Sequence, residues 1–401
     1  MEYHQLGQNS WLKLINQVLK VQEFKKLDSN HLIDLAQDTT KCQEFGPFFN
    51  RDAFEVYVND INSSKTFHQF GKLAIKHKII HHLIDSLRLQ QEISQAPIKD
   101  DLSNVVLITG LWRTGTTYLQ RQLSNHDDFQ SSVGWQMLYP MCPSYKQFKG
   151  RMKAFGTVRL FNTINPLFNI AHPVSYYQEE EDMPLFDMGF TSSINDIITD
   201  LDQYPNFVED QDLFEMYKAA KFVHQTHLQQ KKKSKWFIIK SPHHMDQIQH
   251  LHKLYPQLKI IRIFRDEAKS VESLFNLIFH GYRTFHKSVN KKKIKDRWLR
   301  KTIQLSEAYM QTREQLDDKM FIEIRYEDLI NDFGKSMHYI GKRLSIDIDP
   351  NFTYTKTKRK MLSAKDKLSL EDFGLTKDEV NDHFTHCKVN PPSIDELIAN
   401  A

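Results

Sequence analysis

The chain has 401 residues, of which 40% are hydrophobic and 12% aromatic, so it can bury a core as one large α/β domain or two ordinary ones. Its formal net charge of +4 is small for this length. That charge argues against a nucleic-acid-binding protein and leaves room for a locally basic cleft that takes a small anion. Three widely separated cysteines, Cys42, Cys142 and Cys387, form no disulfide framework or metal-ligand spacing and favour a reducing compartment.

Residues 1–97 are predicted to form a helical region packed on the core. Apolar residues recur at helical spacing from Trp11 to Leu19 and again from Leu73 to Leu87. The N-terminus lacks the charged start, apolar run and cleavage site of a secretory signal. No stretch approaches the roughly 18 apolar residues that span a bilayer. We therefore expect a cytoplasmic protein without an integral membrane segment.

Residues 98–401 are predicted to form an α/β domain, because Pro97 and the polar segment after it mark a boundary. Four short apolar runs, each followed by a helical pattern, indicate buried strands of a parallel sheet with helices on both faces. The irregular segment 140–235, with its prolines and acidic cluster, is predicted to add helices and loops over a site. The predicted strands are Val105–Thr109, Trp236–Ile239, Lys259–Phe264 and Phe321–Ile324.

The first predicted strand leads into a glycine-bracketed loop, GLWRTG, and then into a helix that starts at Thr116. Gly110 and Gly115 allow a sharp turn and a close approach of the backbone to an anion. The amides at the start of the helix then face that anion. The pattern GxxxxGTT keeps the glycines of a Walker A loop but has Thr116 where a nucleotide triphosphatase needs Lys, and its cation is Arg113. This difference argues against hydrolysis of ATP or GTP.

The segment GLWRTGTTYL resembles the 5′-phosphosulfate loop of sulfotransferases that use 3′-phosphoadenosine-5′-phosphosulfate (PAPS). The resemblance covers nearly the whole chain, is strongest from 104 to 345, and is closest to the bacterial-type branch with a helical N-terminal region. It implies a P-loop-like three-layer α/β/α fold and PAPS as donor, with adenosine 3′,5′-bisphosphate as product and no metal. It also implies that the donor's 5′-phosphosulfate is held by Arg113, Thr114, Gly115, Thr116 and Thr117.

Three further strand ends carry residues that match this family in order and spacing. Arg265 directly follows the third strand, and Ser273 comes eight residues later. In the family such a pair grips the donor's 3′-phosphate, as a bidentate Arg and a hydroxyl can. The resemblance gives Lys240 the contact with the leaving 5′-phosphate and places Tyr326 near the adenine. The carboxyl ends of parallel strands are where open α/β sheets bind ligands.

The sequence leaves three candidates for the general base: two histidines and a carboxylate. His172 precedes the acidic cluster Glu179–Asp182, and a similar His-Pro and acidic segment occurs in the resembling branch. We favour His172, with Glu180, Glu181 or Asp182 orienting it or the acceptor. His243 is the rival, because it follows Lys240 by three residues, as the basic His does in cytosolic-type members. A base within hydrogen-bond reach of the acceptor is what the chemistry requires.

The expected function is in-line transfer of a sulfuryl group from PAPS to a hydroxyl or amine of a small-molecule or lipid acceptor, whose identity the sequence leaves open. The alternatives are a P-loop small-molecule kinase and a non-catalytic nucleotide-binding relative. A homodimer is compatible with the sequence, and a nucleic-acid partner is not expected. The lysine runs Lys231–Lys233 and Lys291–Lys293 are predicted to be solvated loop segments, with an acidic partner or a membrane surface as the alternative.

Overall fold

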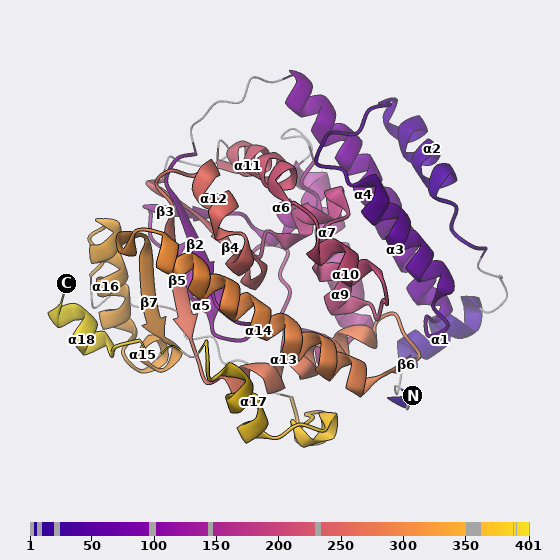
Figure 1. Cartoon of the computed structure of the whole chain (residues 1–401). Coiled ribbons are helices and arrows are strands. Elements are labelled where there is room, and N and C mark those ends of the chain that lie inside the picture. The colour runs from indigo at the N-terminus through magenta and orange to yellow at the C-terminus, as the bar shows by residue number, and fades with distance from the viewer. Residues whose placement is uncertain are drawn as a thin grey trace.

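At the centre of the molecule lies a five-stranded parallel sheet with the strand order β3-β4-β2-β5-β7 (Figure 1). The computed structural model of the chain describes residues 4–5, 10–19, 25–95, 102–142, 147–228, 234–349, 362–387, 389 and 391–400. The four predicted strands are confirmed, whereas β3 was missed because its short sequence, FQS, does not stand out as an apolar run. The strands are β2 (Val105–Thr109), β3 (Phe129–Ser131), β4 (Trp236–Lys240), β5 (Lys259–Phe264) and β7 (Phe321–Arg325).

Helices cover both faces of this sheet because successive strand residues point to opposite sides. Val105 and Leu107 face a core shared with α11 (Phe214–Leu228), α12 (Ile248–Leu254), α13 (Glu267–Tyr282) and α14 (Lys291–Gln315). Val106 and Ile108 face a second core with α5 (Thr116–Leu123), α15 (Tyr326–Asn331), α16 (Phe333–Leu344) and α18 (Ile394–Ala399). The predicted P-loop-like three-layer α/β/α fold is therefore confirmed.

Four helices precede the sheet and lie along one side of it, coloured indigo to violet in Figure 1. The last three of them share a third apolar core with Phe190, Tyr204 and Phe285 from later parts of the chain. The structure also has a short antiparallel pair, β1 (His4–Gln5) with β6 (Ser288–Val289), so this part of the chain is not wholly helical. The helices are α1 (Ser10–Leu19), α2 (Ser29–Thr40), α3 (Arg51–Ser63) and α4 (Gln69–Gln95).

Short helices and loops fill most of the segment between β3 and β4. No helix in the described ranges is both long and apolar enough to cross a membrane. The helices here are α6 (Gly134–Leu138), α7 (Gln147–Ile164), α8 (Pro166–Ala171), the 3₁₀ helix η2 (Met183–Gly189), α9 (Ile194–Ile198) and α10 (Tyr204–Glu209). Elsewhere lie the 3₁₀ helices η3 (Pro242–Asp246), η4 (Asp318–Met320) and η5 (Glu371–Phe373) and the helix α17 (Lys377–Phe384).

The two lysine runs differ from the prediction where the structure describes them. Lys231–Lys233 lies outside the described residues. Lys291–Lys293 does not form a solvated loop: it opens α14, because the side chain of Asn290 caps that helix on the amide of Lys293. Lys293 pairs with Asp200 at 2.6 Å, and Lys291 lies 3.8 Å from Asp372. Two of these lysines are therefore engaged within the chain.

Candidate active site

The loop between β2 and α5 is held in an unusual backbone conformation by its own residues. Gly110 and Gly115 have φ of 143° and 93°, and Arg113 has a φ of 71°, a left-handed conformation that is uncommon outside glycine. A Cβ on Gly110 would lie 2.6 Å from the carbonyl oxygen of Ile263, so only glycine fits against β5. Inside the loop, Thr114 Oγ1 donates to the carbonyl oxygen of Leu111 at 2.8 Å. The first amides of α5 therefore point out of a preformed turn, a geometry that suits an anion.

Arg265 and Tyr326 close the same loop from the ends of β5 and β7. Arg265 Nη1 donates to the carbonyl oxygen of Arg113 at 2.5 Å, and its guanidinium lies 4.4 Å from the centre of the Tyr326 ring. That ring in turn packs on the loop, since a Cβ on Gly115 would lie 3.2 Å from it. The structure therefore brings the predicted residues Arg113, Arg265 and Tyr326 together. Ser273 lies half-buried in α13, and no polar contact joins it to Arg265 within the described residues.

Lys240, at the end of β4, is wholly buried. Its Nζ donates to Thr117 Oγ1 at 3.0 Å and to Glu181 Oε1 at 2.8 Å. One turn after Thr117 on α5, Arg121 Nη2 donates to Glu180 Oε1 at 2.7 Å. Two ion pairs thus hold the acidic residues Glu180 and Glu181 against α5 and the end of β4. Arg121 was not predicted, although its position four residues after Thr117 places both on one face of a helix.

Asp182, the last of the four acidic residues Glu179–Asp182, points elsewhere. Its Oδ1 lies 2.9 Å from Nε2 of the buried His244, whose Nδ1 lies 2.7 Å from the hydroxyl of Tyr217. Burial acts to raise the pKa of Asp182, but the two imidazoles of His244 and His224 outweigh it and hold that pKa below its ordinary value. This buried network was not predicted, because nothing in the sequence spacing brings these helices together. It anchors the acidic run to η3 and α11.

His172 lies beside the two cations of the site. It caps the C-terminus of α8, and its imidazole makes no hydrogen bond within the described residues. Burial lowers the pKa of His172 to about 3, and the charges of Lys240 and Arg121 act in the same direction. Burial raises the pKa of Glu180 to about 7, against the opposing effect of the same two cations. At neutral pH the imidazole is therefore unprotonated, and the nearby carboxyl is poised to gain or lose a proton.

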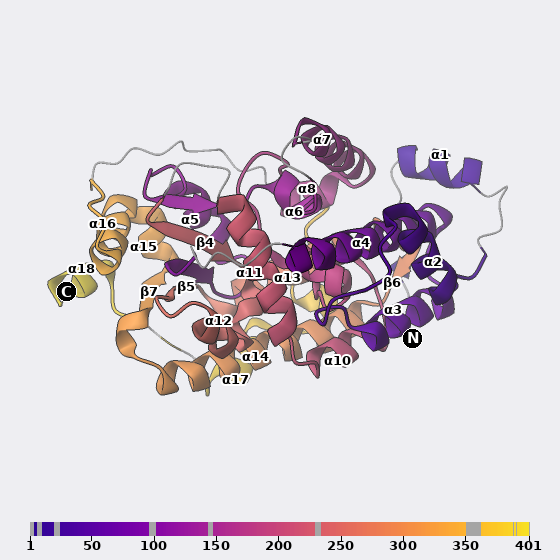
Figure 2. The same ribbon diagram turned by 90° about the horizontal axis from the view of Figure 1, so that it is seen from above.

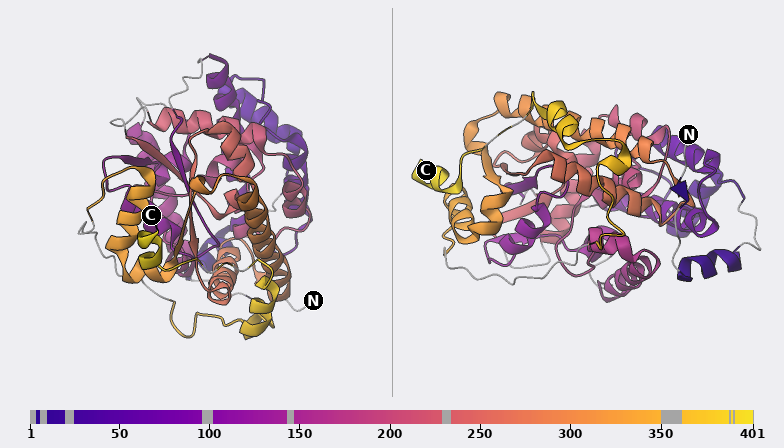
Figure 3. Two further views of the ribbon diagram at one scale, coloured as in Figure 1. Left: turned by 60° about the vertical axis from the view of Figure 1, so that its left-hand side comes forward. Right: turned by 90° about the horizontal axis from the view of Figure 1, so that it is seen from below.

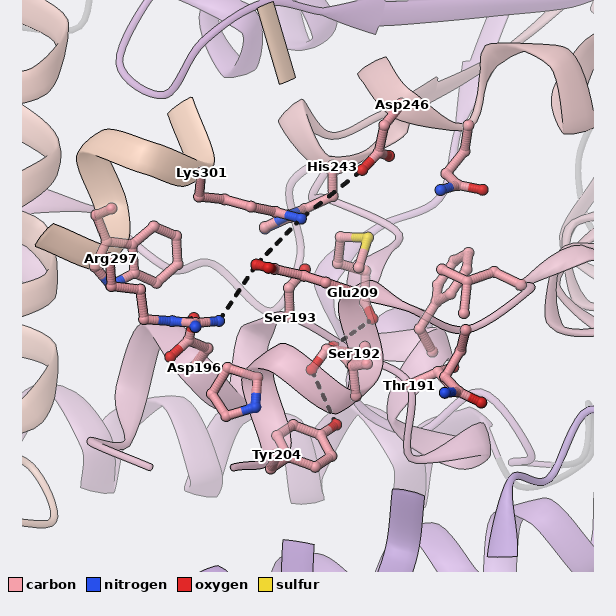
Figure 4. Close-up of a pocket in the computed structure, with 18 of the residues that line it drawn as sticks. Thr191, Ser192, Ser193, Asp196, Tyr204, Glu209, His243, Asp246, Arg297 and Lys301 are labelled. Carbon is pink, nitrogen blue, oxygen red and sulfur yellow. Dashed lines mark hydrogen bonds and ion pairs between the residues drawn. The ribbon is translucent and has the colours of Figure 1, made fainter. Parts of the chain in front are cut away.

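His243 occupies a different environment, shown in Figure 4 with Lys301, Asp246 and Glu209 around one pocket. Its side chain is buried, with the Trp112 ring edge-on at 5.0 Å, and Nε2 has no hydrogen-bond partner in the described part of the chain. Burial, followed by the charge of Lys301, lowers its pKa well below the usual value. The cavity has a volume of about 40 Å³, room for about three waters at roughly 10–15 Å³ each.

A model of the sulfotransferase family matches residues 105–350, which include the phosphate loop and the ends of β4, β5 and β7. The chain belongs to the sulfotransferase family. Among curated proteins, it is 27% identical over 237 residues to the omega-hydroxy-beta-dihydromenaquinone-9 sulfotransferases of Mycobacterium bovis and Mycobacterium tuberculosis. The match covers 57% of this chain and 59% of each of those proteins. The chain therefore spans about three-fifths of the length of the curated relatives it matches.

Solved structures of two sulfotransferases have the same fold as this family member. Sulfotransferase STF9 of Mycobacterium avium superposes with a TM-score of 0.75 at 19% identity, over 91% of this chain and 97% of that one. Sulfotransferase STF1 of Mycobacterium tuberculosis has a TM-score of 0.73 at 20% identity, over 90% and 98% of the two chains. These likenesses extend over about nine-tenths of this chain.

Proposed function

We propose that this protein transfers a sulfuryl group from PAPS to a hydroxyl or amine of a small-molecule or lipid acceptor and releases adenosine 3′,5′-bisphosphate. One observation carries the proposal. The ends of four neighbouring parallel strands bring the phosphate loop, Lys240, Arg265 and Tyr326 to one edge of the sheet. A cradle of amides with several cations and no Walker lysine suits a phosphosulfate better than a magnesium-bound triphosphate.

The donor half of the site fits PAPS in its chemistry. Arg265 uses one N–H on the carbonyl of Arg113, which leaves other guanidinium N–H groups for a 3′-phosphate. Ser273 and Tyr326 are assigned to the 3′-phosphate and the adenine. The 5′-phosphosulfate is assigned to the loop. Because the Thr114 hydroxyl is already hydrogen-bonded within the loop, Thr114 would bind the donor mainly through its backbone amide. Gly115, Thr116 and Thr117 would add contacts at the start of α5.

The chemical step needs a base for the acceptor and a cation for the leaving oxygen. As the S–O bond to the acceptor forms, the acceptor's proton passes to the neutral imidazole of His172. As the bond between sulfur and the bridging oxygen breaks, Lys240 and Arg113 stabilise the charge left on the 5′-phosphate. Neutralisation of Lys240 by the bound donor would raise the pKa of His172, which makes it a stronger base. His243 is the weaker candidate, because the charges that act on it are those of Lys301 and His244 and not of Lys240.

A lipid hydroxyl is the acceptor class that we favour. The support for this choice is that the curated relatives are sulfotransferases of an omega-hydroxylated dihydromenaquinone. A hydroxylated isoprenoid quinone is apolar apart from its ends, so the acceptor side of this chain should offer an apolar path to His172.

A thermal-shift comparison tests the donor. Adenosine 3′,5′-bisphosphate at a hundredfold excess over its dissociation constant should stabilise the protein by about 2.7 kcal/mol, and ATP with magnesium should not. The opposite result would favour the P-loop small-molecule kinase. Transfer of labelled sulfate from PAPS to a lipid extract tests the reaction, since a non-catalytic relative would bind the bisphosphate and label nothing.

A further inference from the structure

The outward side of α7 exposes large apolar side chains as well as basic ones, whereas an ordinary surface helix buries its large apolar residues. The residues that α7 buries are small or lie at its end: Gly150, Ala154, Val158 and Ile164. Gly150 packs so closely that a Cβ there would lie 2.9 Å from Cys142 Sγ. On the opposite side, Phe148 is 76% exposed and Met152 and Leu160 about half exposed. The helix therefore holds the body of the protein with its small residues and offers its large apolar ones to the surroundings.

Helix α1 has the same property and lies against α7. It buries Leu12 and Asn16 and leaves Trp11, Leu14 and Val18 between 51% and 68% exposed. The two helices contact each other and project from the same side of the molecule in both the view from above (Figure 2) and the view from below (Figure 3). We define the α1–α7 face by the exposed residues Trp11, Leu14, Val18, Phe148, Met152 and Leu160.

The charged residues of α1 and α7 are all of one sign. Neither helix contains an Asp or a Glu, while α1 carries Lys13 and α7 carries Lys149, Arg151, Lys153 and Arg159. A whole-chain net charge of +4 makes this a local concentration of positive charge. A second copy of the chain would bring like charges together, which is unfavourable. Exposed apolar side chains next to basic ones, with no acidic residue on either helix, are instead typical of a helix that lies in the interface of an anionic bilayer.

Helix α7, which carries half of the α1–α7 face, also contacts the loop that holds the candidate base. Helix α7 leads through α8 to His172. The ring of Phe155 on α7 lies edge-on to Tyr176 at 5.5 Å, and the amide of the neighbouring Ser175 donates to Glu180 at 3.1 Å. The loop that carries the candidate base is thus in contact with the helix that carries the apolar face.

We propose that the α1–α7 face docks on an anionic membrane surface and presents the acceptor side of the site to a lipid within it. The docking stands on the face alone, and only the lipid acceptor rests on the proposed function. The test is flotation of the full chain with vesicles of phosphatidylcholine, with and without phosphatidylglycerol. The wild type should float with the anionic vesicles. The double variant Met152→Asp/Leu160→Asp should bind them at least about tenfold more weakly, since both apolar side chains leave the bilayer.

Two matched variants separate apolar docking from charge and from general damage. Lys149→Glu/Arg159→Glu should lose the preference for anionic vesicles, and added salt should do the same to the wild type. Ile330→Asp places an acidic residue at an exposed apolar position of α15, at the opposite end of the molecule (Figure 2), and should float as the wild type does. Unchanged thermal unfolding of the Met152→Asp/Leu160→Asp variant shows that its fold is intact.

Three outcomes would overturn the proposal: no flotation of the wild type, equal flotation of Met152→Asp/Leu160→Asp, or a wild-type dimer in light scattering that this variant breaks without any vesicle binding. The last would assign the face to a second copy of the chain. The flotation needs neither donor nor acceptor. Vesicle binding without sulfate transfer would therefore contradict the proposed function and leave the docking proposal intact. Sulfate transfer without vesicle binding would contradict the docking proposal and leave the proposed function intact.

Discussion

The buried ion pair between Lys240 and Glu181 provides a quantitative test of how the site is built. Lys240 has no exposed surface, and its ammonium bonds only Thr117 and Glu181 among the described residues. Glu181→Gln removes the negative charge and keeps the shape. The ammonium is then left buried beside a hydroxyl and an amide, so we expect the variant to be less stable than the wild type.

The size of the loss follows from burial. Removal of one partner from a fully buried pair costs about 3–5 kcal/mol, but the Glu181 side chain is 19% exposed and water in the cleft can solvate the lysine. We therefore expect a loss of about 1–3 kcal/mol. For 401 residues at roughly 2.1 cal/mol/K per residue, this lowers Tm by about 1–4 °C. Lys240→Met combined with Glu181→Gln should recover most of the loss, because no unpaired charge remains.

The assay is thermal unfolding of the wild type, Glu181→Gln and the double variant, each with and without adenosine 3′,5′-bisphosphate. The bisphosphate should raise the Tm of Glu181→Gln more than that of the wild type, because a phosphate can replace the missing carboxylate beside Lys240. Equal Tm values for the wild type and Glu181→Gln would refute the reasoning about the pair. A smaller ligand shift in Glu181→Gln would refute the assignment of Lys240 to the donor.

Three further outcomes are expected. Arg265→Ala should weaken binding of adenosine 3′,5′-bisphosphate by roughly 1.5–3 kcal/mol in calorimetry, the usual value of a charged hydrogen bond; Lys377→Ala, at an exposed lysine, serves as the control. His172→Ala should keep that binding and lower turnover on the order of 10²–10⁴-fold, and unchanged turnover would move the base to His243 or a carboxylate. The pKa of Glu180 is raised from 4.5 to about 7, so the folded state holds the proton on this carboxyl more tightly than the unfolded state does. The free energy of unfolding should therefore fall as pH rises between these two values, by at most about 1.4 kcal/mol per pH unit. Denaturant unfolding of Glu180→Gln should show a flatter dependence of the free energy of unfolding on pH. Loss of the contact with Arg121 would change that free energy by the same amount at every pH. An unchanged slope would contradict the raised pKa of Glu180.

The cluster of strand-end residues that we assign to the donor could be predicted because its determinants are local in the chain. An uninterrupted apolar run such as Val105–Thr109 is buried on both faces of a parallel sheet, and the residue after such a strand lies at the edge where ligands bind. Gly110, Lys240, Arg265 and Tyr326 all follow from that rule, and the structure brings them together.

The partners of these residues could not be predicted, because they come from segments far apart in the sequence. The pairing of Lys240 with Glu181 and of Arg121 with Glu180 depends on how the loop after α8 crosses the end of the sheet. His172 and His243 likewise differ in which cations lie near them. The spacing of residues along the chain does not reveal the burial of a side chain or its neighbouring charges.

The sequence by itself determined the strands, the phosphate loop and the helical nature of the N-terminal segment, since apolar periodicity and glycine positions act over a few residues. It could not tell which side of a periodic helix is covered. Leu12 and Leu14 belong to the same apolar pattern of α1, yet the first is buried and the second faces outward. Only the tertiary structure decided this, because burial depends on the neighbours that packing supplies. The exposed α1–α7 face and the charge pairs of the site arise in that same step.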